Sequence, residues 1–242
     1  MDRQHRKDLK TDKFAEEVFD IFDWASVHRD KVIRYGAIAL VVILAAVAGY
    51  AYFRYQADQR QQALARAVQV DGSTVGPTAQ PGTLNFVTQD EKDKALNKAY
   101  SELASKYSSS DEGAIAQLRL ASMKADRGNL PEAEQAYKRI VESAPAPYSA
   151  LARLSLAQVY AVQGKTSEAE KVLRTAVDQP ATTVSKEQAT IALAQLLMKS
   201  NAAEAKKLLD PLRTSSRAAV SQAASTALAV LPEDLKKEDS KK

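Results

Sequence analysis

The sequence predicts an all-α protein in which one apolar helix precedes a solenoid of helical repeats. Residues Tyr35 to Phe53 form a run of nineteen residues without a charged side chain. In the longer part that follows, glycines and small and large apolar residues recur about every 36 positions. Sequence repeats of about 20 to 50 residues are typical of solenoids, so these two features together define the fold class.

The apolar run predicts a single transmembrane helix over residues 35–53. At about 1.5 Å per residue it is about 28 Å long, which is close to the ~30 Å hydrocarbon core of a bilayer. Aromatic rings, which favour the headgroup level, lie at both of its ends. The alternative is a cleaved signal peptide, because Ala46-Val47-Ala48 offers small residues for cleavage. We favour the uncleaved anchor, because a long amphipathic segment precedes it.

The segment before the span, residues 1–34, is expected to remain in the cytoplasm. It carries eight basic residues, and long C-terminal domains translocate largely regardless of their own charge. An amphipathic helix is expected within it, with the apolar face Phe14, Val18, Ile21, Phe22 and Ala25. In the span, the pair Ala45 and Gly49 is a candidate contact for another membrane helix.

Beyond the span the repeat can be followed residue by residue. Gly128 and Gly164 are 36 residues apart, and the same spacing relates Ala133, Ala169 and Ala205. A third copy of the first helix aligns at 37 residues, with Leu156, Ala157 and Gln158 opposite Leu193, Ala194 and Gln195. Apolar residues at spacings of three and four predict two helices in each unit.

Capping residues and breakers place the helix ends. Thr88 and Glu91 form a capping box, and Asn129 and Asn201 are predicted N-caps. The stretch Gly72 to Thr83 is rich in Gly, Pro and Thr, and we expect a loop there. The resulting segments are a juxtamembrane helix, loop and first helical unit over 54–109, repeats over 110–214, a capping helix over 215–231 and a charged tail over 232–242.

The composition excludes several classes of function for the part beyond the span. The chain has no cysteine, and its two histidines, His5 and His28, both precede the span. Nucleophilic triads and Cys- or His-ligated metal sites are therefore excluded there, and no phosphate-binding glycine loop is present. The net charge of +4 is too small to indicate nucleic-acid binding. We predict no enzyme activity, cofactor or metal.

The repeat resembles the tetratricopeptide repeat on the residues Ala121, Gly128, Ala133, Tyr137 and Pro145. The resemblance implies a degenerate α-solenoid whose first helices line a groove. The implied groove positions form a largely apolar surface, which suits extended nonpolar polypeptide segments where it is exposed; the alternative is that the C-terminal helix or neighbouring units cover it. The groove positions are Ile115, Leu118, Ser122, Ala125, Leu151, Leu154, Gln158 and Ala161.

The order of the parts resembles the ancillary subunit of the bacterial Sec translocon, most closely over Tyr148 to Leu173. This resemblance implies an inner-membrane protein with a periplasmic C-terminal domain. The implied partners are translocon subunits, a membrane-anchored periplasmic folding factor and unfolded secretory clients. The alternative is a structural scaffold of the envelope, which tethers a division or wall-synthesis complex.

Overall fold

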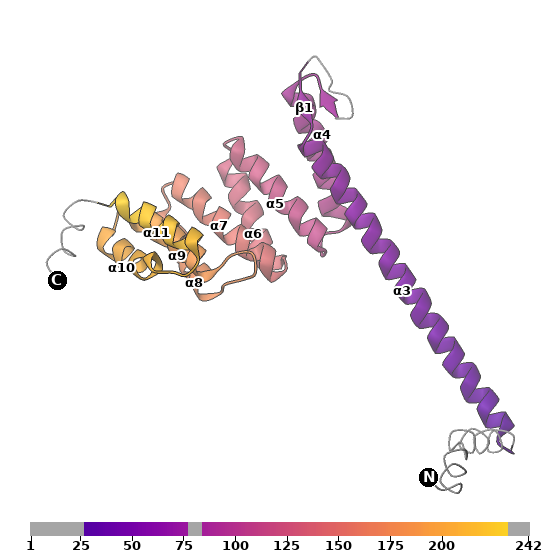
Figure 1. Cartoon of the computed structure of the whole chain (residues 1–242). Helices are drawn as coiled ribbons and strands as arrows, with labels where there is room; N and C mark the ends of the chain where they lie inside the picture. The colour runs from indigo at the N-terminus through magenta and orange to yellow at the C-terminus, as the bar shows by residue number, and fades with distance from the viewer. Residues whose placement is uncertain (1–26, 77–83, 232–242) are drawn as a thin grey trace, which may run out of the picture. The chain divides into compact units, whose positions relative to one another are not determined.

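The computed structural model describes residues 27–76 and 84–231, and the α-helix is its dominant element (Figure 1). The predicted amphipathic helix before residue 27 and the charged tail lie outside these ranges. The helices are α3 (Arg29–Asp71), α4 (Gln89–Lys106), α5 (Asp111–Asp126), α6 (Leu130–Ser143), α7 (Ala146–Val162), α8 (Thr166–Asp178), α9 (Lys186–Leu197), α10 (Ala202–Arg213) and α11 (Ala218–Ala229).

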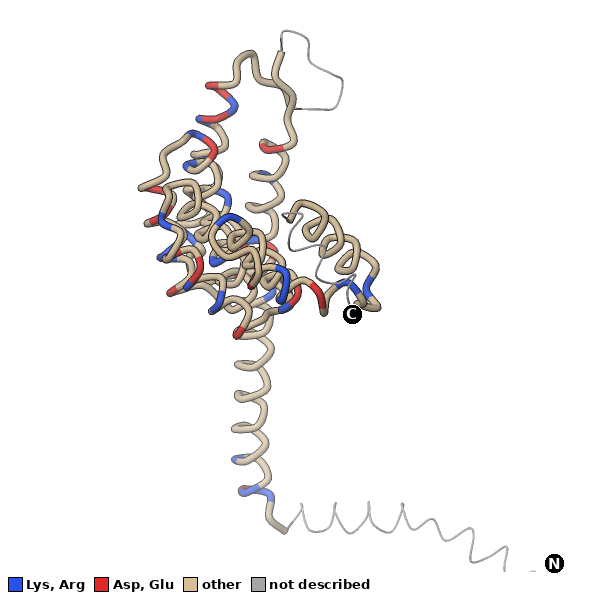
Figure 2. Tube along the Cα trace, turned by 90° about the vertical axis from the view of Figure 1, so that its left-hand side faces the viewer, with Lys and Arg blue, Asp and Glu red and all other residues tan. Residues whose placement is uncertain are grey.

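The chain divides into two compact units, Met1–Gln59 and Arg60–Lys242. The described part of the first unit is dominated by the N-terminal portion of α3. A window of this helix has a mean hydropathy of 2.2, and none of that window is buried. No charged residue interrupts the long uncharged stretch of α3 in Figure 2. The helix is therefore long and apolar enough to span a membrane.

Within the second unit, the C-terminal end of α3 serves as the first helix of the first repeat unit. Ala67 is fully buried, and Leu64 packs beside it against the apolar cluster of α4 and α5. Val68, the next residue along the helix, is 53% exposed and does not join the cluster. The buried members of this cluster are Ala67, Leu96, Tyr100, Leu103, Ala116 and Met123.

The helices from α5 to α11 form the predicted solenoid. Each helix contacts the next one along the chain, and α5, α7, α9 and α11 also form a contacting series. Fully or nearly fully buried alanines let the two helices of a unit approach closely, as at Ala121 and Ala133. Larger side chains such as Tyr137, Leu173 and Leu209 fill the space beside them and are also buried. The predicted fold class is confirmed.

The turns inside the first two complete repeats depend on glycine. Gly128 and Gly164 have φ angles of +78° and +76°, the left-handed region that favours glycine. Main-chain bonds close each turn, for example from the N–H of Asn129 to the oxygen of Lys124 at 2.9 Å. Asn129 is the N-cap residue of α6, as predicted, but its side chain makes no capping hydrogen bond.

The third turn, between α9 and α10, is built differently. None of the described residues there has a positive φ, and the Asn201 side chain accepts a hydrogen bond from the N–H of Glu204 at 3.2 Å. The predicted Asn201 cap is therefore confirmed. Pro211 lies inside α10, which continues to Arg213, so this proline does not end the helix directly. In the repeat register, the distance from the first helix to the second is one residue shorter in this unit than in the unit before it, because equivalent positions of the first helices are 37 residues apart and those of the second helices are 36 apart.

The connection before α4 contains a feature that the sequence did not indicate. Thr74–Val75 (β1) and Asn85–Phe86 (β2) form a short parallel pair on either side of residues 77–83, which lie outside the described ranges. The capping box is confirmed in its first half, because the Thr88 hydroxyl accepts from the N–H of Glu91 at 3.2 Å. The Glu91 carboxylate reaches back to the N–H of Val87, one residue before the predicted position.

Candidate functional site

The predicted groove residues lie on α5 and α7 with different degrees of exposure. All four α5 positions, from Ile115 to Ala125, are half-buried, as are Leu151 and Leu154 of α7. Only Gln158 and Ala161 are exposed. The predicted surface is therefore most open toward the C-terminal end of α7.

A cavity of about 650 Å³ lies at this end, between α7 and α9, with α8 contributing to its wall. It brings together three of the predicted residues, Leu154, Gln158 and Ala161, and it does not include Leu151 or the four α5 positions. Its size is within the usual range of ligand sites, about 300 to 1,000 Å³. The cavity is lined by Leu154, Ala157, Gln158, Ala161, Thr166, Leu173, Gln188, Ile191, Ala192, Gln195, Leu196, Lys199 and Ser200.

The α9 side of the cavity was missed at the sequence level. Gln188, Ile191 and Gln195 are the counterparts of Leu151, Leu154 and Gln158 at the spacing of 37 residues. The sequence contains this spacing of 37 residues in the third copy of the first helix, but the predicted groove positions cover only the first two copies. The observed site joins an apolar pair, Leu154 and Ile191, to an amide pair, Gln158 and Gln195.

The apolar floor of the cavity is also part of the protein core. Leu173 and Ala157 are buried in the main apolar cluster, and Leu154 and Ile191 pack against that cluster from its edge. Because these side chains are held by packing, the floor is preformed. Gln158, Gln188 and Gln195 are exposed, so the groups available to a ligand at the rim are mostly neutral amides.

Several charged residues of the described solenoid are paired with each other outside this cavity. Glu134 contacts Lys138 at 2.6 Å and Lys165 at 2.7 Å, and the two hydrogen bonds hold the pKa of its carboxyl at about 2. Lys165 belongs to the following unit, so this carboxylate links consecutive repeats. Both lysines also lie over the ring of Tyr160.

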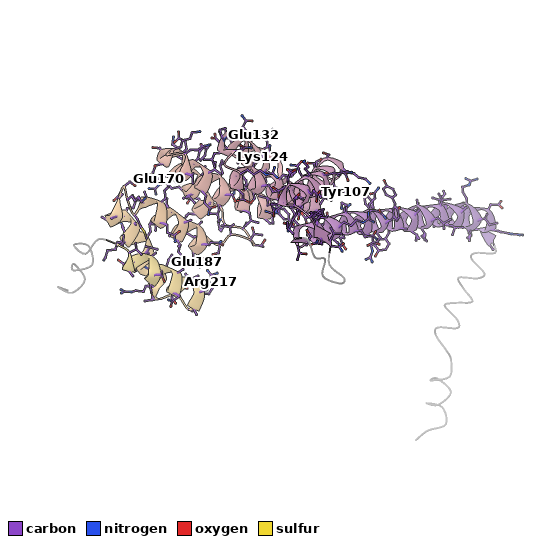
Figure 3. The ribbon with its side chains drawn as sticks, turned by 90° about the horizontal axis from the view of Figure 1, so that it is seen from above. Tyr107, Lys124, Glu132, Glu170, Glu187 and Arg217 are labelled. Carbon is purple, nitrogen blue, oxygen red and sulfur yellow. The ribbon has the colours of Figure 1, made fainter. Side chains whose placement is uncertain are left out.

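The same link recurs one repeat later. Arg174 donates to Glu170 at 2.6 Å and to Glu204 of the next unit at 2.7 Å. Figure 3 shows two further pairs, Lys124 with Glu132, at 3.3 Å, and Glu187 with Arg217. The Arg217 guanidinium is the main cause that holds the pKa of Glu187 at about 2. None of these paired groups lines the cavity between α7 and α9.

Two ion pairs fasten the end of α3 to α5 within the second unit. Arg60 contacts Glu112 at 3.1 Å, and Arg119 donates two hydrogen bonds to Asp71, at 2.6 and 2.7 Å. The Arg119 guanidinium lowers the pKa of Asp71. Burial raises the pKa of the Tyr100 hydroxyl, which lies 3.4 Å from the same carboxylate. The arrangement is a fork-shaped charge pair that fixes the helix end.

The candidate membrane contact of α3 is open in this chain. Ala45 is exposed, and a Cβ built on Gly49 would meet nothing within 4 Å. Among the described residues, no group of three or more acidic or His side chains is placed to hold a metal ion. The cavity between α7 and α9 is therefore the strongest candidate for a binding site.

Comparison with known proteins places the chain in a family. Residues 30–187 match the family described as the tetratricopeptide repeat-like domain, and this is more than half of the chain. The protein belongs to this family, whose helical repeats are scaffolds for protein interaction. A search of curated proteins finds no match.

Two solved structures of kinesin light chain TPR-like repeats from Podosopora anserina are also similar. One of them is a single-residue variant and has a TM-score of 0.47, with 18% identity over 58% of this chain and 77% of that chain. The other has a TM-score of 0.46, with 18% identity over 58% of this chain and 78% of its own.

Proposed function

We propose that this protein is an inner-membrane-anchored, periplasmic interaction protein that is accessory to the Sec translocon and assists the folding or handover of secreted proteins. The observation that carries the proposal is the union of two features in one chain. An apolar helical window, none of which is buried, precedes a repeat domain with an open cavity that has an apolar floor.

Each feature supports a different part of the proposal. The apolar helical window supports a repeat domain that is held at a membrane, with residues 35–53 as the span and the N-terminus in the cytoplasm. The cavity offers a site at which an extended polypeptide could bind noncovalently, as in other tetratricopeptide-like scaffolds. The specific partners, translocon subunits and a membrane-anchored folding factor, follow from the resemblance of the layout to the Sec ancillary subunit.

Site-specific photocrosslinking in intact cells tests the partners and the client site together. A photoreactive residue is placed at Gln195, in the cavity, or at Lys207, an exposed residue of α10 outside it. We expect stalled secretory chains to crosslink to position 195 and not to position 207. Purification through the C-terminal tail should recover translocon subunits with the protein.

Two results would contradict the proposal in different ways. Recovery of wall synthases or division proteins in place of translocon subunits would favour the envelope scaffold. Recovery of the translocon without client crosslinks at position 195 would retain the partner and reject this cavity as the client site.

A further inference from the structure

We infer that the cavity between α7 and α9 selects extended apolar segments that carry acidic or neutral flanking residues, and that it rejects segments flanked by Lys or Arg. The inference rests on the proposed function, because it specifies the client for the site already described. It depends on the charge and hydrogen-bonding capacity of the lining.

The first argument is the charge of the lining. Among the thirteen lining residues, Lys199 is the only charged one, and no carboxylate lines the cavity. Within the ranges that the structure describes, Lys199 takes part in no ion pair. Glu187, which precedes a lining residue in the chain, is paired with Arg217 instead. A basic client residue would therefore meet one like charge and no partner, whereas an acidic one would meet an available cation.

The second argument concerns the amides of Gln158, Gln188 and Gln195. All three side chains are exposed, and none makes a hydrogen bond to another residue among those described. An amide offers both donors and acceptors, so it matches the N–H and C=O groups of an extended backbone in either chain direction. A fatty acid carries a single polar group and would leave these amides unused. The amides thus favour a polypeptide over a lipid.

The third argument is the arrangement of polar and apolar groups. Leu154, Ile191 and Leu196 provide an apolar surface, and the glutamines lie on the same faces of α7 and α9, as their spacing of three or four residues requires. A bulky apolar client side chain can enter the floor while its main chain meets the amides. The amides of the rim would then fix the position of the client main chain, and apolar contacts with the floor would stabilise the bound side chain.

The test uses the full chain in lipid nanodiscs and three fluorescent peptides. Each peptide has the same Leu-rich core, flanked on both sides by Glu, by Gln or by Lys, and empty nanodiscs report partition into lipid. We expect the Glu-flanked peptide to bind most tightly and the Lys-flanked one about five-fold more weakly, the scale of one exposed charge pair.

Two matched pairs of variants locate the effect. Lys199→Glu should reverse the order of the peptides, whereas Lys207→Glu, an exposed charge reversal outside the cavity, should leave it unchanged. Ala161→Trp should fill the cavity and weaken all three peptides, whereas Ala203→Trp on the exposed surface of α10 should not. Circular dichroism confirms that each variant retains its helix content.

The outcomes separate this inference from the proposed function. If all three peptides bind equally, or if Lys199→Glu behaves like Lys207→Glu, the charge selection is wrong while the cavity remains a client site. If Ala161→Trp binds as tightly as the unmodified protein, the peptides bind elsewhere and the inference fails. If no peptide binds, both the selection and the client site are rejected, and translocon association remains to be judged by its own purification.

Discussion

Substitution of Gly113 by alanine tests the packing between α4 and α5 directly. Gly113 is buried in the first turn of α5, where the helix starts beside the end of α4. A Cβ added there would overlap the carbonyl oxygen of Tyr107, and it would lie 2.6 Å from the carbonyl carbon and 3.2 Å from the Cα of Ser108. These atoms belong to the main chain, so no side chain can move away to relieve the overlap.

The loss of unfolding free energy in Gly113→Ala depends on the main-chain atoms that must move. Overpacking of this kind costs about 1 to 3 kcal/mol. The shift also disturbs the cap, in which the Ser110 hydroxyl accepts from the N–H of Gly113 at 3.1 Å, and a lost cap costs about 1 kcal/mol. Alanine recovers up to about 1 kcal/mol through its helix propensity. The net loss in unfolding free energy is about 1 to 3 kcal/mol, which lowers the Tm of a unit of this size by roughly 2 to 12 °C.

The assay is thermal unfolding of the fragment 55–242, followed by circular dichroism, with Gly72→Ala as the matched control. At Gly72 a Cβ would lie 3.6 Å from the nearest atom, an ordinary contact, so this change should leave the Tm unchanged or raise it slightly. Equal melting temperatures for the two variants would refute the close approach of α4 and α5 at Gly113.

Three further predictions address the core, the ion pairs and the topology. Replacing Ala157, which is 3% exposed, with leucine should overpack the helix pair and cost about 1 to 3 kcal/mol of unfolding free energy; an unchanged Tm would reject the assigned unit boundaries. The pKa of Glu134 is lowered from 4.5 to about 2. The ionised carboxylate therefore stabilises the fold fully above pH 4.5, and this stabilisation is lost as the pH falls toward 2. The Tm of Glu134→Gln should depend less on pH in that interval than the Tm of the unmodified protein. Protease added to spheroplasts should remove residues beyond about 55 and leave residues 1–34 protected, and digestion of the N-terminal segment would reverse the proposed orientation.

Much of the solenoid could be predicted from the sequence because its interactions are local and periodic. Alanine at positions such as 133 and 169 permits close helix approach, and glycine at 128 and 164 permits the left-handed turn. Each of these requirements restricts the residue type at its own position, and the sequence therefore shows it directly. Asn129 lies at the predicted N-cap position but makes no side-chain capping bond, and the turn closes through main-chain bonds, which no side-chain pattern reports.

The features that escaped prediction depend on partners distant in the chain. The clamp between Asp71 and Arg119 joins residues 48 positions apart, and neither residue stands out among the interspersed charges of the sequence. The β1 and β2 pair involves only two residues in each strand, too few for a periodic signal. In both cases the contact depends on which distant residue lies nearby in the fold, and the type of each residue alone does not predict that partner.

The candidate site lies between these two cases, and the repeat register explains why three of its residues on α7 were predicted and its α9 wall was not. Leu154 and Gln158 follow from the repeat register alone, but the α9 wall requires the register to shift from 36 to 37 residues. The extra residue enters between α8 and α9, and the third turn, where Asn201 caps α10 without a positive-φ glycine, removes it again. Since the shifted register makes Gln195 the counterpart of Gln158 and Ile191 that of Leu154, one residue in a connection determines which side chains share the cavity. The lining, and with it the proposed selection of clients, therefore depends on the connections that flank α9 as well as on the residues that line the cavity.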